Sequence, residues 1–338
     1  MRKSEVHPSL KALYKQNLQS FMKKEKDAIK KDELRRFLSE RKVSPEQLIH
    51  LHYTTLKEMF PDLSEPISLS FEWLIEVMEC YELTYQQQQN LIDRQKELET
   101  QIEVAANMQK TLLPKQLPSH PKIDIGVISV PARMMSGDYY YCVTDDNDCV
   151  GVAIADIIGK GVPAALCMSM IKYALDSISK EWKQPKALLE NLNRVVERNI
   201  ADSMFITMMY GFYDPKTDTF SYSGAGHEPG FYYDANKDAF FDLATKGIVL
   251  GLTKEPVFRE YSLQMKAGDL IVFLSDGVTE CKVEGRFIER DEIIYLLRKY
   301  IHYPAQEMVR NIYRELAIMQ NFSLKDDLTL MILRRKTS

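Results

Sequence analysis

All 14 glycines of this 338-residue chain lie beyond residue 113. Glycine supplies the positive φ angles that tight turns require, so a long stretch without it favours helices over short strands joined by turns. Apolar residues in this stretch recur every three to four positions, as they do in amphipathic helices. The asymmetry predicts a helical N-terminal part and a separate, strand-rich C-terminal part.

Residues 1–84 are expected to form a small helical bundle. The segment Ser44-Pro45-Glu46-Gln47 has the pattern of a helix start, with a capping serine, proline at the first helical position and Gln47 at the capping-box position. Asp62 and Pro66 indicate breaks, and 70–85 is expected to be a strongly apolar helix. Because so small a bundle buries limited surface, dimerisation would be one way to enlarge its core.

Residues 85–118 are expected to form a linker, with a long helix over 85–113 that prolines end. Its apolar row is Leu91, Leu98, Ala105 and Leu112, and its companion row is Gln88, Gln95, Ile102 and Gln109. A heptad pattern with one mostly polar row predicts weak pairing between helices. Two interpretations stay open: a connector helix that lies on a domain, and a marginal pairing seam that a partner could switch on.

Residues 119–338 have the pattern of an α+β domain. Apolar or aromatic runs predict strands at 123–130, 139–143, 150–154, 204–213, 220–223, 230–233, 270–274 and 328–333. Helices are expected at 163–179, 185–200, 291–300 and 304–319. Short turns between neighbouring strands favour antiparallel sheets with helices packed against them.

The formal net charge of −4 conceals a basic N-terminal end. Residues 1–42 contain 13 Lys and Arg against 6 Asp and Glu, a net charge of +7, so the rest of the chain carries −11. A basic segment could bind nucleic acid or an acidic protein surface. Leucines and phenylalanines are spaced among these charges, which favours solvated faces of amphipathic helices over nucleic-acid binding.

The sequence lacks the pattern of a membrane span or a secretory signal. Its apolar runs are short, such as 270–274, whereas a span needs about 20 mostly apolar residues. Polar residues follow the N-terminal Met1, so we expect a cytoplasmic protein. Five cysteines without a C-x-x-C pair favour reduced thiols over a disulfide framework or a zinc site.

Aspartates stand at predicted strand ends in the C-terminal part. Asp138 opens one strand, Asp156 and Asp276 close two others, and Asp326-Asp327 precede the last. Carboxylates that converge at one edge repel one another unless a cation lies between them, and carboxylate oxygens suit Mg²⁺ or Mn²⁺. Each Asp alone is more often a turn or cap residue, so the prediction of a metal site depends on the combined pattern.

Five short segments carry these aspartates and the glycines beside them. They are Ser136-Gly137-Asp138-Tyr139-Tyr140, Ala155-Asp156-Ile157-Ile158-Gly159-Lys160-Gly161, Ala225-Gly226-His227-Glu228-Pro229, Ser275-Asp276-Gly277-Val278-Thr279-Glu280 and Asp326-Asp327-Leu328-Thr329-Leu330. In this order they resemble the motifs of bacterial metal-dependent type 2C (PPM) serine phosphatases of the SpoIIE/RsbU group. The resemblance extends to 102–107 and 71–85, and five ordered motifs are a specific signal.

The resemblance implies two stacked antiparallel β-sheets flanked by helices, and a centre of two Mn²⁺ or Mg²⁺ ions. Asp138, Asp156 and Asp276 match metal-binding aspartates, and the backbone carbonyl of Ile157 matches a further ligand. The last ligand is Asp326 or Asp327, and the family's Asp-x-x-Thr/Ser pattern favours Asp326. A metal-activated water would attack a phosphoserine or phosphothreonine ester, so no nucleophilic side chain is required.

Three more residues of the motif region carry ionisable side chains. Arg133, by its position five residues before Asp138, resembles the phosphate-binding arginine of eukaryotic relatives, and a surface basic residue is the equal alternative. His227 is expected to be a turn or structural residue rather than a general acid. The sequence assigns no role to Lys160.

The resemblance also implies how such an enzyme is controlled. Residues 1–84 would form a regulatory domain that homodimerises and binds an activating switch kinase of the RsbT type. The substrate of the phosphatase domain, 119–338, would be a phosphorylated anti-anti-sigma factor of the RsbV type, and its dephosphorylation would turn on a general stress response. A separate hypothesis follows from the half-polar heptad: the linker seam of Leu91, Leu98, Ile102, Ala105 and Leu112 would pair in parallel between two chains when the kinase binds.

A second interpretation is a catalytically inactive, phosphatase-like scaffold that binds the kinase. The aspartates at 138, 156, 276 and 326 argue against it, because an inactive copy could lose them at little structural cost. Nucleic-acid binding by the basic end is the third interpretation, and the segment lacks the aromatic interleaving or recognition helix that would favour it.

Overall fold

The computed structural model describes residues 8–25, 31–40, 43–159, 161–177, 183–200, 204–283 and 285–337. The chain forms two compact units that meet in sequence between Leu98 and Glu99. Within the described residues, none of the helices combines the length and the apolar character of a transmembrane span.

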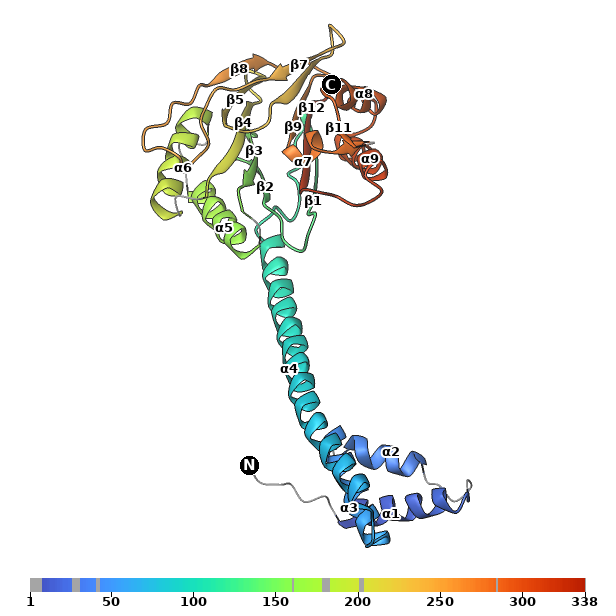
Figure 1. Cartoon of the computed structure of the whole chain (residues 1–338). Helices are drawn as coiled ribbons and strands as arrows, with labels where there is room; N and C mark the ends of the chain where they lie inside the picture. The colour runs from blue at the N-terminus through green and yellow to red at the C-terminus, as the bar shows by residue number, and fades with distance from the viewer. Residues whose placement is uncertain are drawn as a thin grey trace. The chain divides into compact units, whose positions relative to one another are not determined.

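The described part of the N-terminal unit is helical (Figure 1). Its helices are α1 (Pro8–Met22), α2 (Lys31–Glu40), α3 (Pro45–Met59) and the first part of α4 (Glu65–Lys110). The predicted start of α3 is confirmed, because the Gln47 N–H donates to Ser44 Oγ at 3.2 Å and the Ser44 N–H donates to Gln47 Oε1 at 3.1 Å. Leu10 of α1 and Leu51 of α3 are buried in its core.

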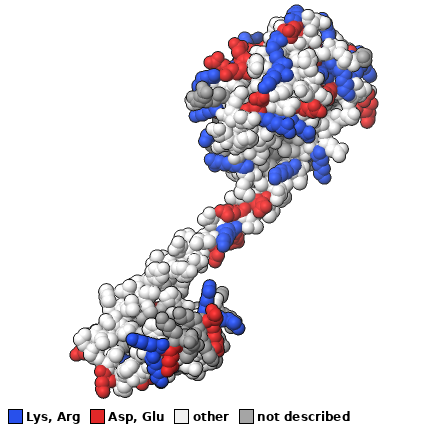
Figure 2. Space-filling view, turned by 90° about the vertical axis from the view of Figure 1, so that its right-hand side faces the viewer, with Lys and Arg blue, Asp and Glu red and all other residues white. Residues whose placement is uncertain are grey.

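Two basic residues of α1 form ion pairs at the surface of this unit. Lys11 and Lys15 both form ion pairs with Glu58 of α3. Figure 2 shows Lys and Arg interspersed with Asp and Glu over the face in view. For the described part of 1–42, this arrangement agrees with the interpretation as solvated faces of amphipathic helices, while 1–7, 26–30 and 41–42 lie outside the described residues.

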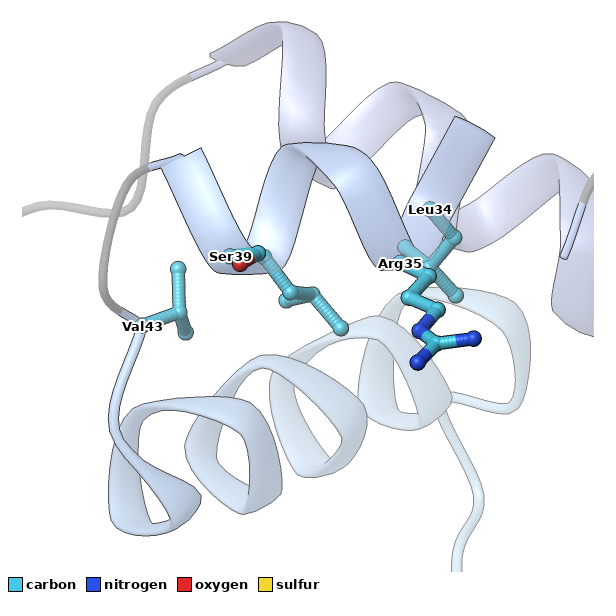
Figure 3. A pocket seen from close by; sticks show the side chains of 5 residues that line it. Leu34, Arg35, Ser39 and Val43 are labelled. Atoms are coloured by element: carbon cyan, nitrogen blue, oxygen red, sulfur yellow. The ribbon is translucent and has the colours of Figure 1, made fainter. Parts of the chain in front are cut away.

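The N-terminal unit also has an open cavity of about 470 Å³ beside α2. Leu34, Arg35, Leu38, Ser39 and Val43 line it (Figure 3). Its described lining contains neither a carboxylate nor an imidazole, so it offers no group for general acid–base chemistry.

α4 is one continuous helix of 46 residues. The expectation of separate helices over 70–85 and 85–113 was wrong, because no glycine interrupts the segment and Pro66 is its second residue, where a missing N–H is tolerated. The helix ends at Lys110, so Leu112 lies beyond it.

The predicted heptad stripe meets two different environments along α4. Leu91, Leu98 and Ile102 are 69%, 52% and 39% exposed. Gln109 is only 6% exposed, and Leu112 packs against the core of the C-terminal unit. The connector-helix interpretation therefore applies to the last turns of α4, while pairing along the exposed part stays a prediction.

The C-terminal unit contains two five-stranded antiparallel sheets with helices on their outer faces (Figure 1). The first sheet, in the order β1-β12-β9-β6-β7, consists of β1 (Ile123–Val130), β12 (Leu328–Arg335), β9 (Leu270–Leu274), β6 (Gly230–Asp234) and β7 (Ala239–Leu243). The second sheet, in the order β2-β3-β4-β5-β8, consists of β2 (Asp138–Thr144), β3 (Val150–Ile157), β4 (Ile206–Asp214), β5 (Thr219–Ala225) and β8 (Tyr261–Gln264). The predicted fold of two stacked sheets is confirmed.

Three apolar clusters hold these layers together. One joins the second sheet to α5 (Val162–Ser177) and α6 (Pro185–Asn199), and another joins the first sheet to α8 (Arg290–Lys299) and α9 (Ala305–Met319). The third lies between the two sheets and includes Ile154, Phe220 and Phe273. Short elements after β9 complete the unit: α7 (Asp276–Thr279), β10 (Lys282–Val283) and β11 (Arg286–Phe287).

All five cysteines are free, with Cys80 exposed and Cys142, Cys149, Cys167 and Cys281 buried. Burial raises the pKa of the Cys142 thiol to about 12, so this residue is a neutral part of the core.

Candidate metal centre

Two of the predicted metal ligands face each other across neighbouring strands. Asp138 is the first residue of β2, Asp156 is the second-last residue of β3, and the antiparallel register pairs them directly. Ile157 follows Asp156, and its N–H donates to the Gly137 carbonyl at 3.1 Å. The motifs around Gly137 and Asp156, 19 residues apart in sequence, therefore meet at one end of the second sheet.

The Asp138 carboxylate is buried and held by two hydroxyl groups. Ser275 Oγ donates to Asp138 Oδ2 at 2.7 Å, and Thr329 Oγ1 donates to the same oxygen at 2.6 Å. Burial raises the pKa of Asp138 well above its ordinary range, and the negative charges of Asp156 and Asp327 raise it further. A divalent cation nearby would offset both effects and favour the ionised carboxylate.

Asp327 uses both carboxylate oxygens inside the protein. The Ala132 N–H donates to Oδ1 at 2.7 Å and the Gly137 N–H donates to Oδ2 at 2.6 Å. These two bonds fasten the loop between β1 and β2, and Asp327 is only 6% exposed. The residue therefore has a structural task that competes with metal binding.

Asp326 lies in a different environment from its neighbour. Burial, followed by the negative charge of Asp326, raises the pKa of Asp276 to about 6. The negative charge of Asp326 therefore acts on Asp276, and the two residues stay the predicted partners in a metal site.

Several of these residues line one cavity of about 180 Å³. Its lining consists of Gly137, Asp156, Ile157, Ile158, Gly159, Asp326 and Asp327. A Cβ added at Gly137 would lie 3.0 Å from the Ile157 carbonyl oxygen and 3.1 Å from Asp156 Oδ1. Glycine at this position leaves space beside two of the oxygens that are expected to bind metal.

The donor chemistry of the cavity fits Mg²⁺ or Mn²⁺. Over the described ranges, no three His, Cys, Asp or Glu side chains gather closely enough to hold a single ion by themselves. Magnesium is commonly bound through one or two carboxylates while it keeps several waters, so opposed aspartates and a carbonyl are sufficient donors. The metal donors that line the cavity are oxygens, which differ from the His and Cys ligands that zinc prefers.

The remaining motif residues lie apart from this donor set. Arg133 is exposed on the loop between β1 and β2, and it forms no ion pair with any residue that the structure describes. Lys160 lies outside the described residues. His227 is buried, its Nε2–H donates to the Leu274 carbonyl at 3.1 Å, and its Nδ1 lies 2.8 Å from Thr207 Oγ1. Burial lowers the pKa of His227 to about 4, which supports the structural interpretation of this residue.

Sequence reasoning missed the residues that position the ligands. Ser275 and Thr329 lie within the recognised motifs but had no separate role, although a hydroxyl beside a predicted ligand is a usable signal. Gln109 was placed in the heptad row, yet its side chain contacts the loop before Asp138. No local pattern distinguishes Gln109 from the other glutamines of α4.

Comparison with known proteins agrees with the fold and the motifs. Residues 12–84 match the family profile described as phosphoserine phosphatase RsbU, N-terminal domain, and residues 146–336 match that of stage II sporulation protein E (SpoIIE). The chain is 49% identical over 297 residues to phosphoserine phosphatase RsbU of Bacillus subtilis, covering 88% of each protein.

Two solved structures show the same fold at low sequence identity. The SiaA-PP2C domain of Pseudomonas aeruginosa matches with a TM-score of 0.63 and 18% identity, over 71% of this chain and 98% of that domain. RsbX in complex with magnesium matches with a TM-score of 0.50 and 17% identity, over 65% of this chain and 98% of that one. With the family profiles and the 49% identity, these findings show that the chain belongs to the SpoIIE family and is a phosphoserine phosphatase of the RsbU type.

Proposed function

We propose that this phosphatase uses two divalent cations, Mn²⁺ or Mg²⁺, for catalysis. Asp138, Asp156, the Ile157 carbonyl, Asp276 and Asp326 would hold them. The observation that carries the proposal is the direct pairing of Asp138 with Asp156 beside a cavity that Asp326 also lines. The magnesium in the structure of the fold relative RsbX lends further support.

The bound ions would supply an activated water and stabilise the charge of an in-line displacement at phosphorus. The protein's own residues then have separate tasks. Ser275 and Thr329 orient Asp138, and Asp327 fixes the loop that leads to it. Arg133, exposed on the same loop, would bind the phosphate of the substrate, for which its planar guanidinium is well suited.

The substrate we propose is the phosphoserine of an anti-anti-sigma factor of the RsbV type, in the cytoplasm. A switch kinase of the RsbT type would activate the enzyme through residues 1–84, and the reaction would turn on a general stress response. The 49% identity to RsbU and the match of residues 12–84 to its N-terminal domain support this proposal.

We also propose that the enzyme is a homodimer. The first half of α4 exposes large apolar side chains, among them Leu69 (57%), Trp73 (67%), Tyr81 (55%) and Leu83 (64%). A single chain leaves this surface in water, and a second copy would cover it. The exposed seam residues Leu91, Leu98 and Ile102 would then pair in parallel when the kinase binds, with Gln88 and Gln95 keeping the resting pair weak.

The test is phosphate release from a phosphoserine-bearing anti-anti-sigma protein, with Mn²⁺ or chelator, and with or without the kinase. We expect chelator-sensitive release that the kinase stimulates. An Asp276→Ala variant should lose it, and Asp146→Ala, at an exposed turn position, should keep it. Phosphate release at the same rate with and without the kinase would refute the proposed activation through residues 1–84. No phosphate release from folded protein would favour an inactive scaffold.

The seam has its own test. Replacing Gln88 and Gln95 with leucine should make the enzyme partly active without the kinase, because both heptad rows would then be apolar. Continued full dependence on the kinase would contradict the pairing scheme.

A further inference from the structure

The last turn of α4 is bonded to the loop that precedes Asp138. The Ser136 N–H donates to Gln109 Oε1 at 3.0 Å, and Gln109 Nε2 donates to the Ser136 carbonyl at 2.6 Å. Gln109 is 6% exposed, so these bonds are shielded from water. A side-chain amide that engages both backbone groups of one residue fixes the position and the orientation of that residue.

The loop itself has little regular structure to fix it. It joins the end of β1 at Val130 to the start of β2 at Asp138. Asp327 accepts the N–H groups of Ala132 and Gly137, and Gln109 holds Ser136 between them. The loop is therefore held by hydrogen bonds to Asp327, which directly precedes β12, and to Gln109 of α4.

Ser136 passes this restraint on to the metal centre. Its Oγ accepts the Asp138 N–H at 3.1 Å. The next residue, Gly137, accepts the N–H of Ile157 through its carbonyl. A displacement of Ser136 would thus move Asp138 and disturb its alignment with Ile157.

Docking of the helix end does not by itself explain a glutamine at this position. Ala106, one turn earlier, is buried without polar side-chain atoms, and Leu112 packs against the apolar core. An apolar residue could fill the same space without the cost of removing an amide from water. The amide becomes favourable only through its two bonds to Ser136.

We infer that Gln109 is a positioning residue of the metal centre, which holds Asp138 in its metal-binding place through Ser136 and ties that place to the end of α4. The inference rests on the proposed metal-dependent function and adds a specific route by which α4 controls it. Pulling or turning the last turn of α4 would release Ser136 and weaken metal binding. Gln109 therefore belongs to the metal centre and not to the pairing seam.

The test uses the full chain and three variants. Gln109→Met keeps the length and the apolar packing but removes both bonds, and Gln109→Leu repeats the loss with another shape. Gln101→Met is the matched control, because Gln101 is exposed on the same helix and lies outside both heptad rows. Mn²⁺ affinity is measured by calorimetric titration, folding by thermal unfolding in chelator, and phosphate release as a function of Mn²⁺ concentration.

We expect Gln109→Met and Gln109→Leu to weaken Mn²⁺ binding about tenfold, the lower end of the effect of removing an outer ligand partner. Excess Mn²⁺ should restore part of the turnover, whereas Gln101→Met should match the parent chain. A folded Gln109 variant with unchanged Mn²⁺ affinity would overturn the inference. Because the binding titration needs no turnover, a parent chain that releases no phosphate would refute the proposed function while the comparison still decides the role of Gln109.

Discussion

Separate replacement of the neighbouring residues Asp326 and Asp327 should produce two different defects. Asp327 accepts two N–H groups of the loop between β1 and β2, whereas Asp326 lines the cavity and its charge acts on Asp276. We expect Asp327→Asn to lower the stability of the fold, and Asp326→Asn to lower the affinity for metal. Asparagine keeps the size of the side chain in both cases, so neither change creates a void.

The size of the first defect follows from the hydrogen bonds. An asparagine at 327 keeps one oxygen acceptor but presents its NH₂ group to the other N–H. The loss of a bond to a charged group, with a buried donor left unpaired, costs about 2–4 kcal/mol. For a unit of this size, such a loss lowers Tm by about 5–10 °C.

The second defect should appear in binding. Asp326 is only partly buried, so Asp326→Asn should change the free energy of unfolding by less than about 1 kcal/mol. Loss of one charged metal ligand should weaken Mn²⁺ binding by at least the roughly 10–100-fold that outer partners contribute.

Calorimetric unfolding of the full chain in chelator separates the two defects, because no bound ion then adds to stability. Titration with Mn²⁺ gives the affinities. If Asp327→Asn kept the parent Tm but lost Mn²⁺ binding, and Asp326→Asn kept both, Asp327 would be the ligand and our assignment would be wrong.

Three further predictions test the surroundings of the centre. Burial lowers the pKa of His227 from 6.5 to about 4. The neutral ring therefore contributes about 3 kcal/mol to the free energy of unfolding, which is fully present above pH 6.5 and is lost as the pH falls towards 4. Denaturant unfolding between pH 7 and 4.5 should show this loss in the parent and in the exposed control His302→Gln, and a much smaller loss in His227→Gln. Thr329→Val removes one of two hydroxyl donors to Asp138 at nearly constant volume, and a Mn²⁺ titration should show about tenfold weaker binding; unchanged affinity would mean that Ser275 alone is sufficient. Gly137→Ala places a methyl group 3.0 Å from the Ile157 carbonyl oxygen, so Mn²⁺ binding should weaken at least tenfold while thermal unfolding changes little, and normal metal affinity would contradict the assignment of that carbonyl.

The parts of the fold that the sequence predicted well are those with a strong local pattern. The strand over 123–130 matches β1, and the capping signal at Ser44 matches the start of α3. β7 and β8 were missed, because they are strands of five and four residues at the edges of their sheets and are partly exposed. Short edge strands carry little periodicity that could identify them.

In the candidate site, too, only the residues that belong to a local sequence pattern were predicted. The aspartates were found because acidic residues at strand ends form a sequence pattern. The contact of Gln109 with Ser136 spans 27 residues and depends on where the end of α4 docks, so no local pattern contains it. The heptad count therefore placed Gln109 in the companion row, whereas in the structure its side chain contacts Ser136.

Because α4 is continuous, the number of its residues matters as well as their identity. Each residue inserted into an α-helix turns everything beyond it by about 100° and advances it by about 1.5 Å. Two residues inserted between Leu91 and Leu98 would therefore place Gln109 on nearly the opposite side from the exposed apolar stripe, whereas seven would leave it about 20° from its present phase. α4 contains no glycine, and no proline after Pro66, and these are residues at which helices often kink. The phase of Gln109 around the helix axis, relative to Leu91, therefore depends on the number of residues between them.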